Sequence, residues 1–207
     1  ETITAYELGF KTARGRDRAE VSGFYYDYKN LQVSTYNGTQ SITTNAAASE
    51  VYGIEASFTK ELITDLTLSG GIAYTHGRYK NYPGAPANIF DYVFDGLNTA
   101  GVPNGGATDG QADNRAIDAS GNHMIRSPDW SGNVAVNYET DLAGGRLAFN
   151  GNLYFSSKVY FDAANNNVQP SYTLGNLRLS WSPASEHFTI SAFVNNVTNK
   201  AVISQVL

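Results

Sequence analysis

The sequence of 207 residues has no cysteine, few charged residues and no long hydrophobic run. Without cysteine there is no disulfide framework, no thiolate metal site and no cysteine nucleophile. No stretch approaches the ~20 consecutive apolar residues of a membrane-spanning helix. Charged residues make up 16% of the chain, against a usual share of about 25%. Because 14 Lys and Arg stand against 19 Asp and Glu, the net charge is −5, which argues against nucleic acid as a partner.

Glycine and aromatic residues dominate what is present. The chain has 20 Gly and 14 Tyr, and aromatic residues reach 13%. Aromatic residues favour strands and glycine favours turns. A chain with this aromatic content has apolar surface to bury, which excludes intrinsic disorder. The composition therefore predicts an all-β protein.

Apolar and polar residues alternate with period two along most of the chain, as half-buried strands require. The clearest case runs from Phe188 to Asn195, where Phe188, Ile190, Ala192 and Val194 share one face. The alternation is weakest in the segment 18–35, because its aromatic residues lie on both faces. The alternation predicts eight strands, at 2–13, 18–35, 41–60, 65–79, 123–139, 146–159, 168–182 and 187–200.

The connections between these strands alternate in length. The short ones are rich in Gly, Asp, Pro or Arg and lie near 14–17, 61–64, 140–145 and 183–186. The others are mostly longer and lie near 36–40, 80–122 and 160–167 and beyond residue 200. In an antiparallel up-and-down meander, every second connection lies at the same end of the sheet. One end with turns and one with long loops is typical of outer-membrane β-barrels.

A soluble β-sandwich is the alternative, because its strands alternate too. Sandwich strands usually have about 5–6 residues, whereas membrane strands need about 9–11, and several of these segments exceed ten. The polar face has few lysines, which suits a water-filled lumen. Five aromatic residues fall near strand ends, as an aromatic girdle requires: Phe58, Tyr74, Trp130, Tyr138 and Trp181.

Four segments resemble barrel strands of TonB-dependent outer-membrane receptors. One matches the recurrent N-A-x-x-x-x-x-G-x-E strand of that family, and the last resembles its penultimate-strand signature. The segments are Tyr6–Lys11, Gly23–Leu31, Asn45–Glu55 and Phe193–Lys200. The resemblance covers nearly the whole chain except 80–122, and it implies a 22-stranded barrel around a plug domain.

The resemblance implies that residues 1–207 are a C-terminal fragment of such a barrel. The plug domain, the TonB box and the last strand are then absent from the chain, whose start at Glu1 rather than Met we attribute to processing or truncation. Residues 80–122 are expected to be a long extracellular loop. The inward residues are too small to fill an eight-stranded barrel, so we expect an open sheet with 2–13 and 187–200 not paired to each other.

The long loop holds the candidate ligand-binding residues Tyr82, Phe90, Tyr92 and Phe94, beside several aspartates. Because aromatic rings can stack on a sugar or a siderophore, we predict that these four form part of an extracellular ligand mouth. A solvated loop that only covers the barrel rim is the alternative. Within the loop, the stretch 109–114 faintly resembles a calcium loop but lacks the bidentate Glu, so we expect a plain turn.

No metal site or cofactor is predicted, because His76, His123 and His187 show no metal-ligand spacing; we expect surface histidines. Glu7, Glu55 and Arg178 occupy polar-facing strand positions. Such charges are tolerated when they are wet or paired, and we expect them to hold the plug or loops in place.

The resemblance implies a non-enzymatic outer-membrane transport receptor of a Gram-negative bacterium. It would take up an iron-siderophore, a vitamin or a carbohydrate with energy from TonB. Its partners would be outer-membrane lipid, the plug domain of the same full-length chain, TonB and an extracellular small molecule. A diffusion porin, a small membrane-barrel enzyme and a soluble carbohydrate-binding sandwich are the alternatives.

Overall fold

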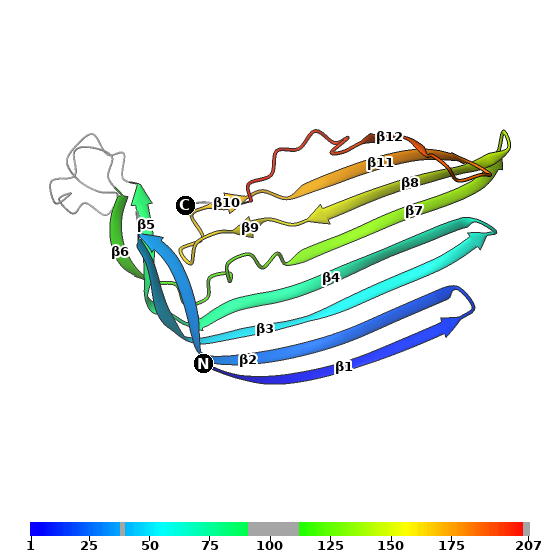
Figure 1. Cartoon of the computed structure of the whole chain (residues 1–207). Coiled ribbons are helices and arrows are strands. Elements are labelled where there is room, and N and C mark those ends of the chain that lie inside the picture. Colours follow the sequence, from blue (N-terminus) through cyan, green and yellow to red (C-terminus); the bar gives the residue numbers. More distant parts are fainter. Residues whose placement is uncertain (38–39, 91–111, 205–207) are drawn as a thin grey trace.

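The computed structural model describes residues 1–37, 40–90 and 112–204 (Figure 1). Eight strands form one antiparallel sheet in which spatial order follows chain order. They are β1 (Thr2–Arg14), β2 (Asp17–Asn37), β3 (Gln40–Ile63), β4 (Leu66–Asn81), β7 (Trp130–Leu142), β8 (Gly145–Ser156), β11 (Tyr172–Pro183) and β12 (Ile190–Val194). The predicted all-β meander of about eight strands is therefore confirmed.

Two small hairpins lie outside this sheet. Strands β5 (Pro83–Phe90) and β6 (Ala112–Asp118) pair within the 80–122 segment, and β9 (Val159–Tyr160) pairs with β10 (Val168–Gln169). The described part of the chain contains no helix long and apolar enough to traverse a bilayer. Figure 1 shows the hairpins and the far ends of β2 and β3 at one end of the sheet, which we name the loop end. The opposite end, with the short turns, is the turn end.

Four predicted strands begin late or end early, and one of them, predicted at 146–159, ends at Ser156. The strand predicted at 123–139 starts only at Trp130, because the preceding residues turn back over β4 and Met124 N–H donates to Gly77 O. The strand predicted at 168–182 starts at Tyr172, after Pro170, which has no N–H to donate. The last strand is short because the chain turns at Asn196 and Asn199, whose φ angles are 54° and 51°.

Strand register places the alternating residues on two distinct faces. Directly paired residues share a face, and Leu179 pairs with Phe149, which pairs with Tyr138. Val136 lies two residues from Tyr138, and Ile190 pairs with Trp181, two residues from Leu179. We name this the apolar face. The opposite, polar face carries mainly Asn, Ser, Thr, Gly and charged residues.

Aromatic side chains mark both ends of the apolar face. Near the loop end, the rings of Tyr25 and Tyr52 stack at 6.4 Å, and those of Tyr74 and Trp130 lie 4.9 Å apart. The residues at the turn end are Phe58, Tyr138, Trp181 and Phe188. Trp130, Tyr138 and Trp181 lie near strand ends as predicted, whereas Tyr74 lies in the middle of β4, beside the start of β7. The two groups bracket an aliphatic band, as in barrels that span a membrane.

The sheet is open. In the described residues no hydrogen bond joins β1 to β12, which form its two edges. The predicted absence of pairing between the first and last strands is confirmed. To become a closed barrel, this sheet would need further strands between β12 and β1.

Candidate functional site

At the loop end, the β4–β7 and β8–β11 connections are tied into one unit. Asn122 Nδ2 donates to Ala163 O at 2.9 Å, and Arg126 N–H donates to Tyr160 O at 2.8 Å. Asn165 joins the two connections twice: its Oδ1 accepts from His123 N–H at 2.8 Å and its Nδ2 donates to His123 O at 3.1 Å. We name residues 118–129 and 157–169 the loop base.

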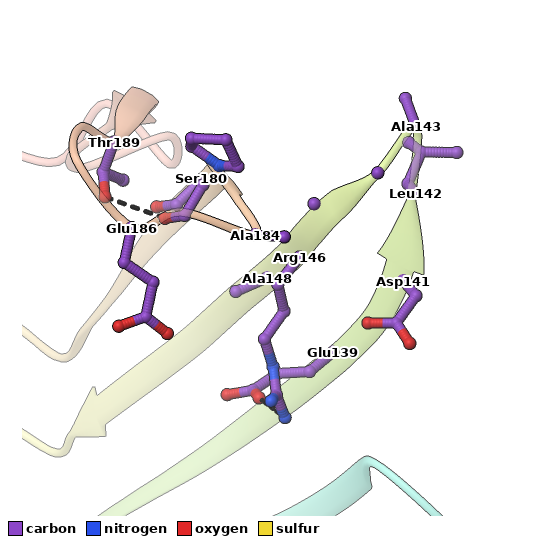
Figure 2. Close-up of a pocket in the computed structure, with 14 residues that line it drawn as sticks. Glu139, Asp141, Leu142, Ala143, Arg146, Ala148, Ser180, Ala184, Glu186 and Thr189 are labelled. Atoms are coloured by element: carbon purple, nitrogen blue, oxygen red, sulfur yellow. Dashed lines mark hydrogen bonds and ion pairs between the residues drawn. The ribbon is translucent and has the colours of Figure 1, made fainter.

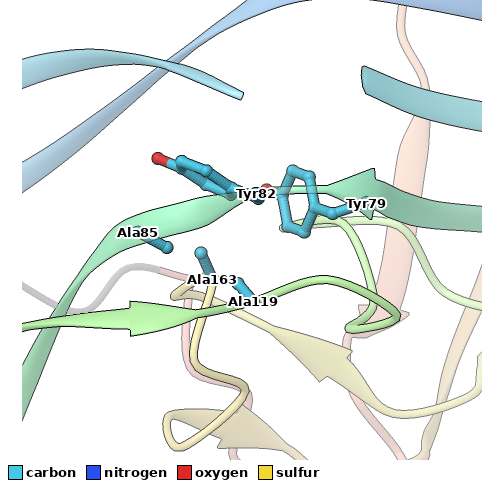
Figure 3. Packing of buried hydrophobic residues seen from close by; sticks show 5 residues of the cluster. All are labelled: Tyr79, Tyr82, Ala85, Ala119 and Ala163. Carbon is cyan, nitrogen blue, oxygen red and sulfur yellow. The ribbon is translucent and has the colours of Figure 1, made fainter. Parts of the chain in front are cut away.

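A small hydrophobic cluster packs beneath the loop base (Figure 3). The rings of Tyr79 and Tyr82 lie 5.2 Å apart, and each residue is 1% exposed. Ala85, Ala119 and Ala163 complete the fully buried set. This cluster brings the end of β4 against both long connections, so the loop base is packed rather than free.

The predicted ligand-contacting residues fall in different places. Tyr82 lies in the buried cluster, and its backbone N–H donates to Ser120 Oγ at 2.9 Å. Phe90 ends β5, with its side chain outside the described part. Tyr92 and Phe94 lie outside the described residues. The binding role of the four stays a prediction.

A group of charged and aromatic side chains borders the loop base. Asp129 Oδ1 lies 3.2 Å from Arg78 Nη1 and 3.6 Å from His123 Nδ1. Burial, followed by the nearby Arg78 guanidinium, lowers the pKa of His123 below its usual value of 6.5. The His123 ring packs on Tyr160 at 4.8 Å, and Lys158 Nζ lies 5.4 Å from the centre of that Tyr160 ring. A neutral His123 therefore suits this arrangement.

Aromatic residues also line the polar face just inside the loop end. On β2, Phe24 stacks on Tyr26 at 5.2 Å, and Tyr26 meets Tyr28 edge to face at 6.5 Å. Across the sheet, Tyr154 and Tyr172 lie 6.0 Å apart. Register places all five on the polar face. These five residues were not among the predicted site residues. The aromatic residues on both faces of the 18–35 segment were the sequence feature that could have revealed the three on β2.

The polar face of the described residues is hollowed in several places, among them a hollow of about 420 Å³ beside Lys11, Arg18 and Ser57. A hollow of about 360 Å³ lies at mid-sheet between Glu55, Asn133 and Tyr154. A larger one of about 820 Å³ lies at the turn end (Figure 2), where Arg146 Nη2 is 2.5 Å from Glu139 Oε2. Polar side chains thus surround open space on this face, while the aliphatic band lies on the other.

Much of the polar face is organised by hydrogen bonds between side chains of neighbouring strands. Asn150 Nδ2 donates to Asn137 Oδ1 at 2.6 Å, and Asn176 Nδ2 donates to Asn152 Oδ1 at 3.0 Å. The face therefore offers amide and hydroxyl groups held in fixed positions.

The charged residues selected from sequence also lie on the polar face. Arg178 donates to Ser180 and Ser191. Glu7 accepts from the Tyr26 hydroxyl, and Glu55 borders the mid-sheet hollow. Their role in holding a plug or loops stays a prediction.

In the part of the chain that the structure describes, no three His, Asp or Glu side chains gather as metal ligands. His76 stacks on Tyr52 at 4.5 Å, and His187 is exposed. Of the stretch 109–114, residues 109–111 lie outside the described part, and residues 112–114 begin β6 rather than forming the expected turn.

Comparison with known proteins matches the sequence profile "TonB dependent receptor-like, beta-barrel" to residues 1–197. No curated protein sequence matches the chain. Among solved structures, the ferric preacinetobactin receptor BauA of Acinetobacter baumannii is 21% identical, with a TM-score of 0.65; the match covers 97% of this chain and 26% of that one.

Two further structures have a similar fold. The ferric yersiniabactin uptake receptor FyuA of Yersinia pestis is 18% identical, with a TM-score of 0.69, and covers 97% of this chain and 25% of its own. The siderophore receptor PiuA of Acinetobacter baumannii is 18% identical, with a TM-score of 0.68, and covers 98% and 25%. The chain thus spans about a quarter of the length of the receptors it matches.

Proposed function

Because this chain belongs to the TonB-dependent receptor-like β-barrel family, we propose that it forms part of an active-transport receptor in the outer membrane of a Gram-negative bacterium. The family is one of receptors rather than enzymes. The observation that carries the proposal is the two-faced open sheet. Its aliphatic band between two aromatic groups suits lipid, and its hollowed polar face suits a wide aqueous lumen.

We propose that residues 1–207 supply the C-terminal part of the barrel and that 80–122 is an extracellular loop. The polar face would then surround the plug domain, and TonB would act through parts of the receptor outside this chain. Supporting this, the short turns lie at one end and the long connections at the other. Barrels of this class place short turns in the periplasm.

We propose that the transported nutrient is a ferric siderophore. The structural neighbours, which are receptors for siderophores, support this class, and so do the aromatic rings on the polar face near the loop end. Phe24, Tyr26 and Tyr28 would offer flat surfaces to an incoming chelate. Phe90, Tyr92 and Phe94 would contact it at the mouth, while Tyr82 anchors the loop that carries them.

Uptake by the full-length receptor tests the proposal. In a strain that has no other siderophore receptor, we expect accumulation of iron-55 from a panel of ferric siderophores, and its loss when tonB is deleted. Accumulation that persists without TonB would indicate a diffusion porin instead. No accumulation from any siderophore, with normal insertion of the receptor, would contradict the siderophore assignment.

A pair of adjacent residues tests the aromatic site. Tyr26→Ala removes a ring from the polar face, whereas Tyr25→Ala removes one from the apolar face of the same strand. We expect Tyr26→Ala to weaken siderophore binding by roughly tenfold, since a stacked aromatic pair contributes about 0.5–1.5 kcal/mol beyond its buried area. Tyr25→Ala should leave the binding constant unchanged.

A further inference from the structure

A groove of about 390 Å³ lies at the turn end of β1 to β4. Its floor is formed by residues of the apolar face: Thr12, Ala19, Phe58 and Leu68. Thr12 pairs with Ala19, and Ala19 pairs with Phe58, so these three form one row across the strands. The small Ala19 between Thr12 and the Phe58 ring leaves the hollow. We name it the turn-end groove.

Two cations stand on the rim of this groove. Arg14 pairs with Asp17, two residues nearer the turn than the Thr12–Ala19 pair. Lys60 forms an ion pair with Asp17. The Lys60 side chain is 54% exposed, and Arg14 forms no ion pair with an acidic residue of the described ranges. The rim therefore has an excess of positive charge on a chain whose net charge is −5.

The position of the groove matches the level of lipid headgroups. Phe58 belongs to the turn-end aromatic group, and aromatic residues at such positions lie at the boundary between hydrocarbon and water. Arg14 and Lys60 lie just beyond it, where long basic side chains reach the headgroup region. The apolar floor of the groove thus lies at the depth of the acyl chains of a phospholipid, and its cationic rim lies at the depth of the headgroup phosphate.

We propose that the turn-end groove binds one anionic phospholipid of the periplasmic leaflet. An acyl chain lies over Ala19 against Phe58. Asp17 lies between Arg14 and Lys60 and pairs with Lys60, so the headgroup phosphate lies on the outer side of this row, next to the Arg14 guanidinium and within reach of the Lys60 ammonium. Complementary charge and an apolar floor continuous with the lipid-facing band favour a lipid over a free anion. The inference goes beyond nutrient uptake, although it rests on the proposed position in the membrane.

Lipid retention by the full-length receptor tests this site. The receptor is inserted into nanodiscs of phosphatidylglycerol and phosphatidylcholine, extracted in mild detergent and analysed by native mass spectrometry. We expect one phosphatidylglycerol to remain bound, and the double variant Arg14→Gln/Lys60→Gln to bind it roughly tenfold more weakly, as expected for loss of two cations near a membrane surface. Ala19→Phe, which fills the groove without changing charge, should also abolish retention.

The matched control is Lys11→Gln/Arg146→Gln, which removes the same charge from the polar face in the half of the sheet nearer the turn end. This control should retain the lipid as the unaltered receptor does. Equal loss in both double variants, equal retention of phosphatidylcholine, or displacement by millimolar glycerol phosphate would each overturn the proposal. Failure of the receptor to enter the nanodisc would instead contradict the proposed membrane function.

Discussion

At the scale of single residues, Gly53 shows how closely the strands approach on the polar face. A Cβ atom there would lie 2.0 Å from Tyr74 O and 2.8 Å from the Phe24 ring. We expect Gly53→Ala to lower the free energy of unfolding by about 1–3 kcal/mol, as overpacking does. Denaturant unfolding of the receptor in lipid vesicles measures this.

Gly23 is the matched control for this substitution. It lies in the neighbouring strand, and the nearest atom to its added Cβ, Gly53 O, is 3.8 Å away. Gly23→Ala should therefore change the free energy of unfolding by much less. Equal effects of the two substitutions would show that strand entropy, and not the close approach at Gly53, sets the cost.

His123 makes the loop base sensitive to pH. Its pKa is below 6.5 in the folded chain, chiefly because of burial, so the unfolded state binds the proton more readily. The stabilising contribution is complete above pH 6.5 and is lost as the pH falls through the folded-state pKa. We expect amide exchange of the loop base, corrected for intrinsic rates, to accelerate between pH 7 and pH 5.

The variant His123→Asn separates this effect from general acid destabilisation. It has no group that titrates in this range, while its backbone N–H can still donate to Asn165. Its corrected exchange at the loop base should depend much less on pH. An unchanged pH dependence in His123→Asn would show that His123 is not the group responsible.

At the scale of elements, the two long connections should open together, because Asn165 is one of several residues that join them. Its φ angle is 60°, so Asn165→Gly removes the side chain without straining the backbone. Loss of both hydrogen bonds to His123 should lower the local opening free energy by about 1–3 kcal/mol. Amide exchange should accelerate in both connections at once.

Asn166→Gly provides the control for this link. The backbone N–H of Asn166 lies 3.4 Å from Asp162 Oδ2, and this contact survives the substitution. Exchange in the β4–β7 connection should therefore stay unchanged in Asn166→Gly. Faster exchange of only the β8–β11 connection in Asn165→Gly would mean that the connections move separately.

A charged side chain should be costly on the apolar face of β7 and tolerated on its polar face. Val136 lies on the apolar face, and its neighbour Asn137 lies on the polar face, bonded to Asn150. We expect Val136→Arg to cost about 2–4 kcal/mol in folding into lipid vesicles, and Asn137→Arg to cost far less. Equal costs would indicate a core buried on both faces, as in a soluble sandwich.

At the scale of the whole molecule, period-two alternation was enough to predict the sheet. Side chains along a strand point alternately to its two faces, so the face of one residue fixes the faces of all the others. Leu179, Phe149 and Val136 could therefore be assigned to one face before any register was known. The same alternation did not reveal where strands stop. The start of β7 follows a turn at Arg126, and the end of β12 precedes a turn at Asn196; both residues have positive φ angles. The Asn196 turn is held by local hydrogen bonds to Lys200, whereas Arg126 N–H donates to Tyr160 O in another connection.

The candidate site was less predictable than the fold. Local sequence placed Tyr82 in a long insertion, but its burial depends on Ala163, about 80 residues away, in another connection. The aromatic rings of Tyr154 and Tyr172 meet only through the pairing of β8 with β11. Contacts of this kind depend on the register between strands. Composition and residue spacing do not determine that register.

The open edges predict how this chain behaves alone. Strand β1 pairs only with β2, and β12 pairs only with β11, so each has one side without a strand partner in the described residues. Such edges promote association between copies. Refolded alone in detergent, residues 1–207 should form oligomers, as measured by light scattering after size-exclusion chromatography. Refolding together with the rest of the receptor should instead give a closed barrel that resists unfolding in SDS until heated, because both edges are then paired. A stable monomer of residues 1–207 in detergent, with backbone amides of β1 and β12 protected from exchange, would contradict the open arc.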